Sequence, residues 1–105
     1  MRVAFEAPLE QLSQRRATYL AVHVPDEESD LLDDLGLPRG GFGSIKVAAT
    51  IGSTRWPTSV FPVERQFLLL VARRVATAEN LEVGEPVRVT LDVLAEGGRS
   101  RDDDG

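Results

Sequence analysis

The sequence contains no cysteine, which excludes disulfide bonds and thiolate metal sites. No stretch approaches the roughly 18 consecutive apolar residues that a membrane helix needs, and the N-terminus lacks an apolar segment of signal-peptide length. Lysine and arginine, 12 in all, are outnumbered by 17 aspartates and glutamates, which argues against a nucleic-acid partner. From these absences we expect a cytoplasmic protein with no membrane anchor.

The length of 105 residues fits a single domain. We place this domain at residues 1–94, because the following stretch "AEGGRSRDDDG" has no apolar residue after Ala95. Residues 95–105 are therefore predicted to form a disordered acidic tail. A second acidic segment, residues 26–34, lacks the spacing of a calcium loop and is interpreted as a solvated helix face.

Apolar residues alternate with polar ones along most of the chain, which is typical of β-strands with one buried face. The pattern predicts six strands, at residues 3–9, 20–24, 45–51, 55–61, 67–71 and 87–93. The fifth of these is a short continuous apolar run, "FLLLV", which is consistent with a buried strand.

Two short helices are predicted between the strands. The segment "VPDEESDLLDDLG" has a proline near its start, acids in its first turn, and Gly36 where a helix often ends. The segment "VARRVATAENLEVG" has apolar residues at helical spacing and ends near Asn80, a residue that tolerates the left-handed conformation of a helix cap.

The order strand, short helix, glycine, strand occurs twice, and each time another strand precedes it. The sequence therefore predicts two β-β-α-β units of about 45 residues, neither of which buries its apolar face alone. Paired about a pseudo-twofold axis, the two units would form a small, mainly β, six-stranded barrel, closed or nearly closed, and one chain would complete it as a monomer or a loose dimer.

The stretches "FEAPL", "YLAVHVP", "GGFGSIKVAATIGSTRWPTSVFP" and "LEVGEPVRVTL" resemble the bacterial domain-of-unknown-function family DUF1905. The resemblance covers residues 3 to about 94 and is most specific between Gly41 and Pro62. It implies a β-barrel related to the double-split barrels of the AbrB and MazE type, in which a unit similar to residues 81–89 recurs. The family prefers Gly-Asp where this chain has Gly84 and Glu85, and its biochemical role is not established, so the resemblance implies no activity.

The glycine-rich loop "RGGFGS" at residues 39–44 is the first candidate for a binding site. It is neither a Walker loop nor a dinucleotide fingerprint. Two interpretations stay open: a nest of backbone N–H groups that binds an anion, or a bend that needs positive φ angles to enter a strand. The first interpretation places Arg39, Gly41, Phe42, Gly43 and Ser44 on one lip of the site.

The strands that follow would supply the other lip, formed by Lys46, Arg55, Trp56 and Ser59. The cationic side chains would attract a small anionic ligand, and Trp56 would be either a flat wall of the pocket or a residue of the core. His23 would need a serine and an orienting acid beside it to act in a hydrolase. No catalytic residue, metal ligand or cofactor is predicted.

Three classes of function stay open. A non-catalytic module that binds a small molecule or a protein partner fits the sequence best. The alternatives are a DNA-binding transcriptional regulator, by analogy with AbrB, and an enzyme of unknown reaction.

Overall fold

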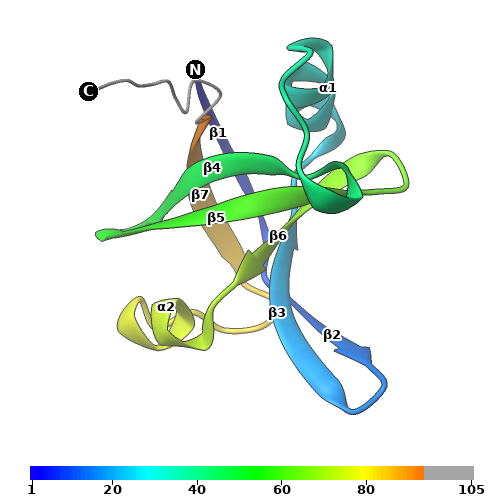
Figure 1. Cartoon of the computed structure of the whole chain (residues 1–105). Helices are drawn as coiled ribbons and strands as arrows, with labels where there is room; N and C mark the ends of the chain where they lie inside the picture. Colours follow the sequence, from blue (N-terminus) through cyan, green and yellow to red (C-terminus); the bar gives the residue numbers. More distant parts are fainter. Residues whose placement is uncertain (94–105) are drawn as a thin grey trace, which may run out of the picture.

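The computed structural model describes residues 1–93, so the tail predicted at residues 95–105 lies outside the described residues. The chain forms seven β-strands and two α-helices. In Figure 1 the strands make one curled sheet, with α1 at its top and α2 at its bottom. In chain order the elements are β1 (Arg2–Pro8), β2 (Glu10–Gln14), β3 (Ala17–His23), α1 (Asp26–Asp34), the 3₁₀ turn η1 (Gly41–Gly43), β4 (Ile45–Ile51), β5 (Thr54–Val63), β6 (Gln66–Val71), α2 (Arg73–Ala78) and β7 (Pro86–Val93).

The strands form one antiparallel sheet in the order β1-β7-β4-β5-β6-β3-β2, curled into a half-barrel. The mainly β class and the two helices are confirmed, but the prediction of six strands in a closed barrel is wrong. The strand expected at residues 3–9 ends at Pro8, and a further strand, β2, follows it. Because β1 pairs with β7 while β2 pairs with β3, the sheet begins and ends with strands that do not pair with each other.

The break between β1 and β2 lies at Leu9, whose backbone bonds to a turn. The Leu9 N–H donates to the Glu85 carbonyl over 3.0 Å, and the Gly84 N–H donates to the Leu9 carbonyl over 2.8 Å. β2 then turns into β3 through Arg15 and Arg16, with Arg15 at a φ of +58°. Two arginines are not a turn signal, so the sequence pattern did not reveal this hairpin.

Corresponding strands of the two predicted units pair with each other. β3 pairs with β6, and β4 pairs with β7, both antiparallel. Gly36 follows α1 at a φ of +61°, and Asn80 follows α2 at +54°, so both predicted left-handed positions are confirmed. Neither α-helix within residues 1–93 is long and apolar enough to span a membrane.

The core fills the concave side of the sheet. Alternate residues of β1, β3, β4, β5, β6 and β7 point into it, as expected for strands with period two. Leu32 of α1 and Val75 of α2 are fully buried and close the two ends. Trp56 of β5 belongs to this core, with 5% of its surface exposed.

Candidate functional site

The glycine-rich loop uses its own backbone N–H groups. Gly40 N–H donates to the Ser44 carbonyl, Gly43 N–H to Gly40, and Ser44 N–H to Gly41, over 2.8 to 3.1 Å. Gly43 has a φ of +74° and lies against Pro62, while Phe42 has a φ of +59°. An anion nest would need these backbone N–H groups to be free, but they are already bonded within the loop. The positive φ angles fit the other interpretation, in which the loop is a bend.

The charged residue of the first predicted lip, Arg39, is bonded within the protein. Its Nη1 donates to the Gly43 carbonyl over 2.8 Å, and its Nη2 donates to Asp33 Oδ1 over 2.9 Å. Its guanidinium also lies 5.2 Å from the centre of the Phe67 ring. Of the other predicted lip residues, Gly41 is exposed in η1, Ser44 is buried, and the Phe42 side chain is 94% exposed.

The second predicted lip is spread along the β4–β5 hairpin. Lys46 is paired with Ser59 near the glycine loop, whereas Arg55 and Trp56 lie toward the hairpin turn. Arg55 Nη1 donates to Asp92 Oδ2 over 2.7 Å, and Trp56 is packed in the core. The structure therefore groups Arg39 with the glycine loop but does not bring Arg55 and Trp56 to the same surface.

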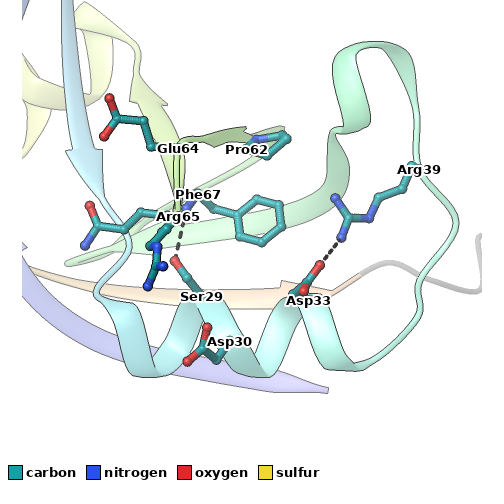
Figure 2. Close-up of a pocket in the computed structure, with 9 residues that line it drawn as sticks. Ser29, Asp30, Asp33, Arg39, Pro62, Glu64, Arg65 and Phe67 are labelled. Atoms are coloured by element: carbon teal, nitrogen blue, oxygen red, sulfur yellow. Dashed lines mark hydrogen bonds and ion pairs between the residues drawn. The ribbon is translucent and has the colours of Figure 1, made fainter.

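Arg39 does line a polar cleft of about 330 Å³ between α1 and the β5–β6 turn. Figure 2 shows the Phe67 ring in the middle of this cleft, with the Arg39–Asp33 pair to one side and Ser29 below. Ser29 Oγ donates to the Val24 carbonyl over 2.9 Å and accepts from the Phe67 N–H over 3.0 Å. Because these polar groups already have partners, we interpret the cleft as the joint that holds α1 and the glycine loop to the sheet.

Arg39→Ala is expected to lower the free energy of unfolding by about 1 kcal/mol, because it removes a hydrogen bond to a carbonyl and a contact with an aromatic ring. Urea denaturation followed by circular dichroism measures this loss. Arg55→Ala is the control and should cost less, because Arg55 makes one exposed ion pair. Equal losses in the two variants would contradict the role given to Arg39.

A larger apolar surface lies on the outer, convex side of the sheet. β6 is apolar on both sides, since Phe67, Leu69 and Val71 point into the core while Leu68 and Leu70 point outward. With residues of β2, β3 and β5, these two leucines line an open cleft of about 500 Å³. We call the following five residues the apolar face: Leu12, Tyr19, Phe61, Leu68 and Leu70.

A second cleft, of about 400 Å³, adjoins the first and shares Tyr19 and Leu70 with it. It is also lined by Leu20, Trp56 and Val71, which are buried on the inner side of the sheet, and it reaches Arg73 of α2. Tyr19 is 42% exposed, whereas both outer leucines are half-buried by their neighbours. The first cleft thus lies on the outer side of the sheet over β2, β3, β5 and β6, and the second leads from its edge toward the core beside α2.

The outer side of the sheet is polar over β1, β4 and β7. β7 occupies the place in the second unit that β4 occupies in the first, and it points Arg88, Thr90 and Asp92 outward. Asp92 accepts hydrogen bonds from Arg2 Nε over 2.8 Å and from Arg55 Nη1 over 2.7 Å. The same sheet thus has a polar outer side that water covers and an apolar outer side that nothing in residues 1–93 covers.

The bonds from Arg2 and then Arg55 hold the pKa of Asp92 below the usual value for aspartate. A carboxylate with a lowered pKa in the folded state stabilises the fold above its unfolded pKa, and this contribution is lost as the pH falls through the folded pKa. We therefore expect the stability difference between the wild type and Asp92→Asn to be present above about pH 4 and to disappear in more acidic solution. Melting temperatures of both proteins between pH 2 and pH 6 measure it, and a constant difference would contradict this role.

His23, the single histidine, meets an acid at the edge of the apolar face. Its Nδ1 lies 2.7 Å from Glu10 Oε2, and both side chains are half-buried. The prediction from sequence considered a serine and an acid beside His23, and it did not identify Glu10 because β2 was missed. Within residues 1–93, no three side chains of the kinds that bind metals are grouped together.

The family model described as "Domain of unknown function (DUF1905)" matches residues 5–91. No curated protein matches the chain.

Proposed function

We propose that this chain, which belongs to the DUF1905 family of domains of unknown function, is a non-catalytic binding module. It docks a protein partner through the apolar face. The observation that carries this proposal is the outward orientation of Leu68 and Leu70 on β6, next to three further large apolar side chains.

Uncovered apolar side chains on a sheet have a cost in water, because burying apolar surface is favourable by roughly 25 cal/mol per Å². The outer side of β7 avoids this exposure, since it points arginine, threonine and aspartate outward. An extended apolar patch of this kind is typical of a protein–protein interaction site. Tyr19 and Phe61 add the aromatic residues in which such interfaces are enriched.

The shape of the surface favours a protein over a small molecule. Small-molecule sites enclose most of the ligand surface, whereas the two clefts here are open, adjoin each other and extend over four strands. A partner with a broad apolar surface would cover both clefts at once. The predicted anionic ligand at the glycine loop has less support, because Arg39 and the loop N–H groups are bonded internally.

We also infer that the two β-β-α-β units are related by an approximate twofold axis and that the fold is related to the AbrB-type split barrels. The pairing of β3 with β6 and of β4 with β7 supports this inference. The inference concerns the fold alone, and the proposed function depends on the apolar face.

Photo-crosslinking in cells that produce the protein tests the proposal. A photoreactive phenylalanine derivative is placed at Tyr19, on the apolar face, and at Arg88, an exposed position on the outer side of β7. We expect a protein adduct of defined mass from position 19, at least ten times more abundant than from position 88. Equal yields at the two positions, or no adduct from position 19, would contradict the proposal.

A further inference from the structure

The two ends of the apolar face carry opposite charges, so the face is complementary to a second copy of itself. We infer that the apolar face binds a second copy of this chain, with the two faces packed against each other about a twofold axis and their strands antiparallel. This inference rests on the proposed function and adds the identity and the orientation of the partner.

One end of the face is acidic on balance, since the carboxylates of α1 outnumber Arg39 and Arg65 beside it. α1 follows β3 directly and carries six carboxylates and no basic residue: Asp26, Glu27, Glu28, Asp30, Asp33 and Asp34. It lies at the end where β3 finishes and β6 begins, since the Val24 N–H donates to the Phe67 carbonyl over 2.8 Å and Gln66 Nε2 donates to Asp26 Oδ1 over 2.9 Å. In Figure 1 this end is at the top.

The other end is basic. The β2–β3 turn carries Arg15 and Arg16, and the start of α2 carries Arg73 and Arg74, all four exposed. Arg73 Nη2 lies 3.4 Å from the Thr18 carbonyl, which places its guanidinium beside the Tyr19 end of the apolar face. In Figure 1 the β2–β3 hairpin and α2 are both at the bottom, opposite α1. Four of the chain's 12 basic residues thus gather at one end of an otherwise acidic protein.

A surface that is apolar in the middle, acidic at one end and basic at the other is complementary to itself. A twofold axis that lies in the plane of the contact, perpendicular to the strands, puts the acidic end of each copy against the basic end of the other, while the apolar centres meet. A parallel arrangement would instead put like charges together, which is unfavourable. Tyr19 and Phe61 would lie inside this contact as aromatic anchors.

Sedimentation equilibrium of the whole chain over a range of concentrations tests whether the second copy binds. We expect a reversible dimer with twice the monomer mass of 11.5 kDa. Leu70→Asp should weaken the dimer at least tenfold, whereas Thr90→Asp, at a half-buried position on the outer side of β7, should leave it unchanged. Circular dichroism spectra show whether each variant is folded, and Leu70→Ser replaces Leu70→Asp if the charged variant does not fold.

Charge reversal tests the orientation. The first variant carries Arg15→Glu with Arg16→Glu, and the second carries Glu27→Lys with Asp30→Lys. In an antiparallel dimer each variant alone brings like charges together at both ends, so each should dimerise at least tenfold more weakly. Mixed one to one, the two variants bring opposite charges together at both ends, so we expect a heterodimer about as stable as the wild-type dimer.

Three results would overturn the inference: a wild-type chain that stays monomeric up to 500 µM, a dimer that Leu70→Asp leaves intact, or variants that fail to form a heterodimer when mixed. If the chain stays monomeric while position 19 still crosslinks to a different protein in cells, the inference of a second copy fails and the proposed docking function stands. If no crosslink forms either, both fail.

Discussion

Trp56→Ala is expected to lower the free energy of unfolding by about 3–5 kcal/mol, among the largest effects of any single substitution in this chain. Trp56 is 5% exposed and lies in the core, on β5 opposite Ala49 of β4. Removing the indole would leave a large cavity in the core. Urea denaturation followed by circular dichroism measures the loss, since the variant has no tryptophan fluorescence.

Trp56→Phe is the matched control, because it keeps an aromatic ring and most of the volume. Its expected cost is about 1–2 kcal/mol. The two variants distinguish the two interpretations of Trp56 that the sequence left open. A loss below about 1 kcal/mol for Trp56→Ala would mean that the residue is a pocket wall and not part of the core.

Gly52→Ala is expected to lower the free energy of unfolding by about 2–3 kcal/mol, from two causes. Gly52 has a φ of +59°, which costs an alanine about 1 kcal/mol or more. A Cβ atom at this position would also collide with the carboxylate of Glu79. That carboxylate accepts hydrogen bonds from Thr54 Oγ1 over 2.6 Å and from Ser53 Oγ over 3.3 Å, so its displacement would release the hairpin turn from α2.

Two controls separate these causes, with urea denaturation as the measurement. Gly36→Ala has nearly the same φ, +61°, and no atom within 4 Å of the new Cβ, so it should show the backbone cost alone. In a Glu79→Ala background, Gly52→Ala should lower the free energy of unfolding by about as much as Gly36→Ala does, because the colliding carboxylate is absent. An unchanged cost in that background would show that Glu79 does not hold the turn.

The sequence predicted the strands and helices well wherever the local pattern was sufficient. Alternation identified β4 and β7 within about one residue of their bounds, and Gly36 and Asn80 correctly indicated left-handed positions after the helices. The break at Leu9 could not be predicted, because it depends on hydrogen bonds to Gly84 and Glu85, far along the chain. The missing strand β2 is a consequence of that break and of a turn made by two arginines.

The candidate site was less predictable, because alternation shows which residues share a face and not whether that face is covered. The run from Phe67 to Val71 was interpreted as a buried strand, whereas only Phe67, Leu69 and Val71 are buried. The continuous apolar run correctly indicated that both sides of this strand are apolar. The local sequence does not reveal that the outer leucines lie without a helix over them. The contacts of Arg39 with Asp33 and Phe67 likewise depend on the position of α1.

Footprinting by single cysteines tests most directly whether a protein covers the apolar face, because the chain has no cysteine of its own. Leu70→Cys lies on the apolar face, and Thr90→Cys is an equally half-buried position on the outer side of β7. The rate of alkylation by a maleimide is measured at each position in intact cells and in dilute purified protein. For each position we take the ratio of the alkylation rate in dilute solution to the rate in cells. We expect this ratio to be at least ten times larger at position 70 than at position 90. Equal ratios at the two positions would contradict the proposal.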